Sequence, residues 1–139
     1  MKKIHFHQEE IQFSLESESK TSTWISKIID SENKITGEIN YIFCSDNYLH
    51  KINLEHLNHD TFTDIITFDY VENGIISGDI FVSIDRVKEN AKEFKDLFNN
   101  ELNRVLAHGV LHLLGYKDKT EAEAKEMRSK EEFALSLFS

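Results

Sequence analysis

Residues Leu102–Asp118, LNRVLAHGVLHLLGYKD, combine a helical repeat of apolar side chains with two histidines four positions apart. The apolar residues recur three or four positions apart, a spacing that predicts an amphipathic helix. Gly115 follows the last of them, and glycine is favoured just past the end of a helix. Because the segment is so rich in large apolar residues, we expect this helix to be mostly buried.

The two histidines of this helix, His108 and His112, predict a metal site. Residues four apart lie on one helix face, with Cβ atoms about 5–6 Å apart. The carbonyl end of a helix also carries a partial negative charge that favours a cation. Asp118 follows the turn at Gly115 and is the predicted third ligand. Three protein ligands leave one position for water, as in catalytic zinc sites, so we expect one zinc ion per chain and a hydrolytic function.

The alternative is that both histidines are ordinary core residues with satisfied hydrogen bonds. Gly109, between them, argues against it. Glycine inside a helix costs about 1 kcal/mol relative to alanine, so something is expected to approach the backbone here. This observation favours the metal site. The zincin pattern H-E-x-x-H has its general-base glutamate at the position of Gly109, so a zincin-type peptidase is disfavoured.

The remaining elements are expected on both sides of this helix. Alternating apolar residues predict strands at 3–7 and 38–44, and Thr21 or Ser22 is the expected cap of a helix around 24–29. Two β-rich runs, 64–70 and 75–82, flank the turn 72–74 and predict an antiparallel hairpin. Further helices are expected over 83–98, over 102–114 and, behind a capping box, from residue 120 onward. Early strands and late helices indicate an α+β domain that spans residues 1–139.

Composition sets limits on the kind of protein. The 139 residues include 40% hydrophobic and 29% charged side chains, which is typical of one globular domain. Neither a secretory signal nor a membrane span is expected, so the predicted location is the cytoplasm. Cys44, the single cysteine, lies in an apolar run and is expected to be buried. The net charge is −9, and without a basic stripe the composition itself argues against nucleic-acid binding.

Three acidic residues are candidates for catalytic roles. Asp64 and Asp79 border the predicted hairpin, where a carboxylate facing the metal could orient the attacking water. The alternative is a strand-end cap or a turn hydrogen bond. Glu101 could support the histidines from behind, or simply be an acidic residue in the first turn of its helix.

The segment His108–Tyr116, HGVLHLLGY, resembles the signature of the YbeY family of metal-dependent endoribonucleases. The resemblance extends upstream through Ile52-Asn53, Thr63–Phe68, Gly78–Ile80, Ala91 and Glu101-Leu102, and downstream to Met127. It implies an α+β fold with about four strands and a zinc at the helix end. It also implies cleavage of single-stranded ribosomal RNA in ribosome biogenesis and quality control.

The sequence departs from the family pattern at two places. The family usually ends its motif with Asp-His, whereas this chain has Lys117-Asp118, so Asp118 takes the place of the third ligand. The family also tends to carry an arginine six residues before the threonine of its Thr-Asp segment, and this chain has Leu57 there. His59, Lys117 and Arg86 are therefore the candidates for binding substrate phosphate.

Two other functions stay open from the sequence. The same metal could hydrolyse another ester or an amide. Alternatively, the chain could be a ribosome assembly factor whose acidic surface binds ribosomal proteins or a ribosome-associated GTPase, with the metal kept for stability.

Overall fold

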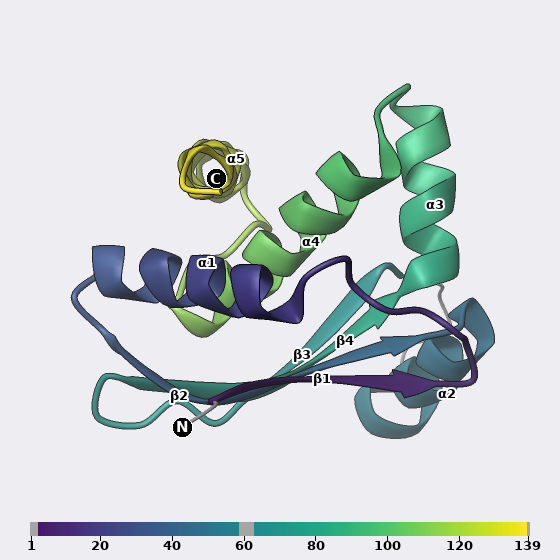
Figure 1. The fold of residues 1–139 in the computed structure, drawn as a ribbon, viewed down its shortest axis with the longest axis horizontal. Helices are drawn as coiled ribbons and strands as arrows, with labels where there is room; N and C mark the ends of the chain where they lie inside the picture. Colours follow the sequence, from purple (N-terminus) through teal and green to yellow (C-terminus); the bar gives the residue numbers. More distant parts are fainter. Residues whose placement is uncertain (1–2, 59–62, 139) are drawn as a thin grey trace.

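The sheet has four strands in the order β1-β2-β4-β3 (Figure 1). In this computed structural model, which describes residues 3–58 and 63–138, β1 (Ile4–Glu9), β2 (Ile35–Cys44) and β4 (Ile75–Ser83) are parallel. β3 (Ile65–Asp69) runs antiparallel to β4. The predicted hairpin is thus confirmed, and so is the α+β class with a small sheet.

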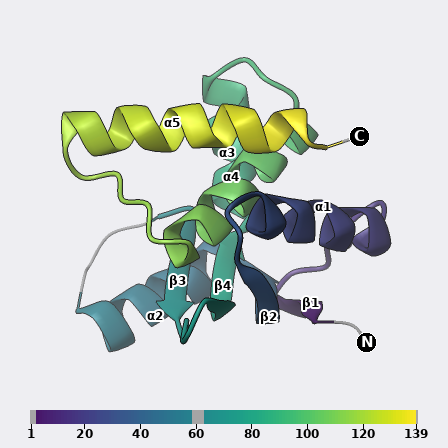
Figure 2. The same cartoon turned by 90° about the vertical axis from the view of Figure 1, so that its left-hand side faces the viewer.

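Five helices pack around this sheet in the described part of the chain. They are α1 (Glu18–Ser31), α2 (Asp46–Leu57), α3 (Ile84–Glu93), α4 (Phe98–Leu113) and α5 (Glu121–Ser136). α1 and α4 cover one face of the sheet, α5 forms an outer layer over α4, and α2 lies on the opposite face (Figures 1 and 2). α4 therefore lies between the sheet and α5. It is mostly buried, as its apolar sequence predicted.

The main core joins the inner face of the sheet to α1 and α4. Its largest fully buried side chains include Trp24, Tyr41, Phe43, Ile80 and Leu106. A smaller cluster under α2 contains Cys44, Leu49, Ile52 and Ile66. Burial of Cys44 is confirmed, and burial raises the pKa of its thiol to about 12.

The hairpin turn has the backbone that its sequence predicts. Asn73 and Gly74 both have positive φ, 52° and 76°, and Glu72 and Ile75 exchange backbone hydrogen bonds across the turn. Two central residues with positive φ match the twist of the flanking strands, and Asn-Gly adopts this conformation with little strain.

Two predictions about helices were wrong, and one helix was not predicted. α1 begins earlier than expected, with Ser17 as its cap: the Ser17 hydroxyl accepts from the Lys20 amide. The helix expected over 83–98 ends at Glu93, because Lys95 has a φ of 55° and reverses the chain. Phe98 therefore starts α4. α2 was not predicted at all.

Candidate metal centre

α4 lies close against the sheet at Gly109. A Cβ at this position would lie 2.9 Å from the side chains of both Ile65 and Ile80. The expected close approach to the Gly109 backbone is therefore confirmed, and the group that approaches is the sheet. Side-chain packing explains this glycine, so it is not itself evidence for a metal.

The loop after α4 turns the chain back over the helix. Gly115 has a φ of 104°, a left-handed conformation that glycine adopts without steric cost. The amide of Tyr116 donates to the Leu111 carbonyl at 3.0 Å, and that of Gly115 donates to His112. This turn brings Asp118 back to the two histidines.

The structure brings the three predicted metal ligands together. The Nε2 atoms of His108 and His112 lie 2.9 Å apart. Asp118 Oδ2 lies 3.3 Å from the first of these atoms and 3.6 Å from the second. One ligand atom from each residue falls within 4.8 Å of the others, and in the described part of the chain this is the one such group of three. The side chains are 15%, 26% and 41% exposed, so solvent reaches the group from the Asp118 side.

The other ring nitrogen of each histidine donates to a protein acceptor. His108 Nδ1 donates to Glu131 Oε2 at 2.6 Å, and His112 Nδ1 donates to the Tyr116 carbonyl at 3.0 Å. These bonds fix each ring and leave the Nε2 lone pair for a metal, an arrangement common around metal-binding histidines. Glu131, on α5, is a further candidate site residue that the sequence did not predict.

The donor set fits a divalent transition metal. In tetrahedral zinc sites with metal–ligand distances of about 2.0–2.1 Å, the ligand atoms lie about 3.3 Å from one another. The distances between the two Nε2 atoms and Asp118 Oδ2 are close to this value. The pKa of His112 is lowered, mainly by burial and to a smaller extent by repulsion from a protonated His108. Asp118 opposes this shift. The neutral imidazole that binds metals is thereby favoured.

Arg104 joins the carboxylates behind His108. Its guanidinium donates to both oxygens of Glu101, at 2.7 and 3.0 Å, and to Glu131 at 3.4 Å. Its Nη2 also lies 3.8 Å from Asp64 Oδ2. Glu101 and Asp64 therefore both belong to the ionic network around Arg104, which lies one turn of α4 before His108.

Asp64 is a largely buried carboxylate in this network. Burial raises its pKa, while Arg104 and His108 oppose that shift. Its side chain accepts a long hydrogen bond of 3.4 Å from Asn90. Asp64 is thus a predicted catalytic residue whose proton affinity is higher than that of an ordinary aspartate.

Other predicted site residues lie elsewhere or make other contacts. Asp79 is on the sheet face away from α4, where it accepts from Asn40 at 3.1 Å and from the Tyr70 hydroxyl at 3.2 Å. Arg86 donates to Asp46 at 2.8 Å. Lys117 is exposed in the loop before Asp118, and His59 lies outside the described residues.

A cleft of about 530 Å³ between α4 and α5 opens beside the histidines and is called here the α4–α5 cleft. His108 and Asp118 line it. Its other charged lining residues are the cations Arg104 and Arg128 and the carboxylates of Asp96, Glu101, Glu131 and Glu132. Phe94, 63% exposed, also lines it, so the cleft offers both charged and aromatic contacts.

Fold and site together define a small α+β protein with a His₂Asp candidate metal centre on its central helix. Its family is shown by comparison: the model described as Endoribonuclease YbeY matches residues 3–139, and the chain belongs to that family. The resemblance read from the sequence is therefore confirmed.

Individual relatives agree with this assignment. Endoribonuclease YbeY of Flavobacterium johnsoniae is 60% identical over 135 residues, which cover 97% of this chain and 96% of the relative. The protein of the same name from Flavobacterium psychrophilum is 57% identical, covering 93% and 92%. The solution structure of TM1509 from Thermotoga maritima matches with a TM-score of 0.69 at 27% identity, over 97% of this chain and 88% of that one. No helix within residues 3–58 and 63–138 is long and apolar enough to cross a membrane.

Proposed function

We propose that this chain is a zinc-dependent endoribonuclease that cuts single-stranded ribosomal RNA during ribosome biogenesis and quality control in the cytoplasm. The observation that carries the proposal is the convergence of His108, His112 and Asp118 beside the open α4–α5 cleft. Family membership supplies the reaction type, since its members are named as endoribonucleases. The ribosomal substrate rests on the resemblance of the HGVLHLLGY segment to the family signature.

His108, His112 and Asp118 would hold the metal. When bound, zinc polarises a phosphoryl oxygen and provides a nucleophile at neutral pH. Glu131 and the Tyr116 carbonyl keep both imidazoles oriented for this role. Asp64 is the candidate to accept a proton, because it is near His108 and its pKa is raised.

Few cations are available in this chain to bind the phosphates of an RNA substrate. The chain carries a net charge of −9, and Leu57, 41% exposed at the end of α2, replaces the family arginine. Arg104 and Arg128 are the cations that line the α4–α5 cleft. Together with Lys117 in the adjoining loop, Arg128 is the candidate for phosphate binding, because three carboxylates already surround Arg104.

The direct test combines metal analysis with cleavage of a single-stranded ribosomal RNA fragment. The wild-type chain is expected to carry about one zinc and to cut the fragment. His112→Ala should do neither, whereas the matched variant His7→Ala, on the outer face of the sheet, should do both. Cleavage by metal-free His112→Ala at the wild-type rate would refute the proposal.

The acidic surface and Leu57 favour a second candidate, hydrolysis of another ester or amide by the same centre. Leu57→Arg separates the two. If RNA is the substrate, an added phosphate contact should tighten binding and steepen its salt dependence by about one counterion. An unchanged salt slope, together with turnover of an ester or peptide panel, would favour the second candidate.

A scaffold role in ribosome assembly is the third candidate, favoured by the same acidic surface. Asp118→Ala should then lose the metal but still capture ribosomal proteins or a ribosome-associated GTPase. If loss of metal abolishes capture as well as cleavage, a separate scaffold role is excluded.

A further inference from the structure

β1 is an edge strand, paired on one side only, with β2. The Lys3 carbonyl accepts from the Ile39 amide, so the backbone groups of odd-numbered residues point toward β2. Those of Ile4, Phe6 and Gln8 therefore point outward, since successive residues alternate along a strand. Proteins usually block such edges with proline, bulges or inward charges. None of these devices occurs between Ile4 and Gln8, so the edge can accept another strand.

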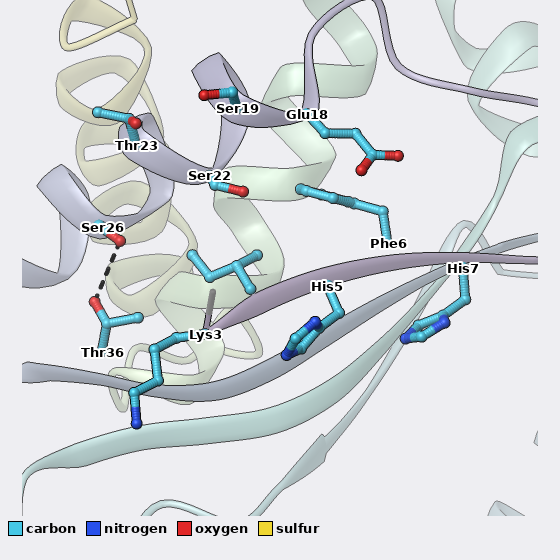
Figure 3. Close-up of a pocket in the computed structure, with 11 residues that line it drawn as sticks. Lys3, His5, Phe6, His7, Glu18, Ser19, Ser22, Thr23, Ser26 and Thr36 are labelled. Carbon is cyan, nitrogen blue, oxygen red and sulfur yellow. Dashed lines mark hydrogen bonds between the residues drawn. The ribbon is translucent and has the colours of Figure 1, made fainter. Parts of the chain in front are cut away.

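A groove of about 520 Å³ runs along this edge beneath α1 (Figure 3). The half-buried Phe6 ring points into it from β1. The side of α1 that lines the groove begins with Glu18 and then carries small hydroxyl side chains, those of Ser19, Ser22, Thr23 and Ser26. These small side chains leave room for another large side chain next to Phe6.

The sequence of β1 is complementary to itself in one antiparallel register. With Phe6 on a two-fold axis, Phe6 faces Phe6 of the second copy and Ile4 faces its Gln8. In this register every outward-pointing backbone group of the strand belongs to a hydrogen-bonded pair. The same register places Lys3 opposite Glu9 of the second copy, on the sheet face away from α1. Opposite charges directly across a strand pair attract, and the symmetry forms this pair twice.

We infer that the chain forms a two-fold symmetric dimer through β1, in which two four-stranded sheets join into one continuous sheet. The Phe6 rings of the two copies fill the grooves under both α1 helices. Because the axis is perpendicular to the sheet, both metal centres lie on the same face of the dimer. This inference is independent of the proposed activity.

Charge reversal at the two ends of β1 tests the dimer. Sedimentation of the untagged chain from about 1 μM to 1 mM should give its dimer dissociation constant. Lys3→Glu or Glu9→Lys should raise that constant about tenfold, since each converts two attractive pairs into two repulsive ones. The double variant should return it to near the wild-type value. Lys51→Glu, the same reversal on exposed α2, is the control and should leave it unchanged.

A second variant tests the groove. Ser22→Trp should fill the space meant for the second Phe6 and shift the chain to monomer, and thermal unfolding should confirm that the variant is folded. A wild-type chain that is monomeric at all these concentrations would overturn the inference. So would a double charge variant that dimerises no better than the single ones, or a folded Ser22→Trp chain that dimerises like wild type.

Discussion

Two pairs of histidines in this molecule have opposite surroundings. His108 and His112 lie on α4 with their Nε2 atoms 2.9 Å apart, and each Nδ1 donates to a protein acceptor. His5 and His7 lie on one face of β1 with ring centroids 6.5 Å apart, and their Nε2 atoms bond separately to Glu38 and Asn40. Spacing alone puts either pair on one face. The hydrogen bonds behind the rings determine which pair can share an ion.

The largest expected difference between the pairs is in metal affinity. His108→Ala or His112→Ala should weaken zinc binding by more than about 100-fold, beyond the range typical of residues that only orient a ligand. His5→Ala and His7→Ala should bind zinc like wild type. Competition with a chromophoric chelator measures all four affinities. If variants of both pairs lost zinc affinity equally, the α4 pair would not be a specific metal site.

Asp118 sharpens the comparison, because only the α4 pair has a nearby carboxylate on the same side as both Nε2 atoms. Asp118→Ala should weaken zinc binding by about 100-fold, near the upper limit for orienting residues, since this candidate ligand is the most exposed of the three. Asp118→His should keep the metal, and the more positive centre should let activity rise at lower pH. Chelator competition and rates from pH 6 to 9 test both. Wild-type affinity in Asp118→Ala would place the third ligand elsewhere.

Glu131 tests whether orientation matters to the α4 pair. Glu131→Ala should lower zinc affinity by about tenfold, since His108 loses the acceptor of its Nδ1 proton. Glu131→Gln, which keeps an acceptor oxygen, should lose less. Nitrogen chemical shifts of the imidazoles report the His108 tautomer directly. A Glu131→Ala chain with the wild-type tautomer and affinity would remove Glu131 from the centre.

The smallest expected effect is on the stability of the fold. It concerns Asp64, a carboxylate in the partly buried surroundings of the α4 pair. Burial raises the folded-state pKa of Asp64, so the stabilising contribution of its protonated form is lost as the pH rises through that pKa. Asp64→Asn stays neutral and should raise Tm by about 2–4 °C at pH 7.5. The difference should shrink toward pH 4. Lower stability of the variant at pH 7.5 would show that Arg104 outweighs the cost of burial.

The candidate ligands could be predicted from the sequence because the information is local. The i, i+4 spacing and the turn at Gly115 are both features of one continuous segment, and that segment also carries the family signature. Glu131 could not be found in this way, since it lies 23 residues beyond His108 on another helix. Its position depends on how α5 packs across α4, which no short pattern encodes.

α2 was missed for a related physical reason. Its buried positions are Leu49, Ile52 and the polar Asn53, so most of the helix is polar and no apolar repeat stands out. Ser45 caps its first turn by accepting from the Tyr48 amide, but a single serine is a weak signal. Packing over β3 and β4, not local propensity, stabilises this helix.

The close packing of α4 on the sheet at Gly109 affects the geometry of the candidate metal centre. With no Cβ, the helix axis lies closer to Ile65 and Ile80 than alanine would allow. Gly109→Ala would improve helix propensity by about 1 kcal/mol, yet it would lift α4 by a few tenths of an ångström. His108 and His112 would move with the helix, whereas Asp118 and Glu131 belong to other segments. The spacing between the candidate ligands thus depends on the distance between helix and sheet, so we expect substitutions in the hydrophobic interior to change metal selectivity even where no candidate ligand is replaced.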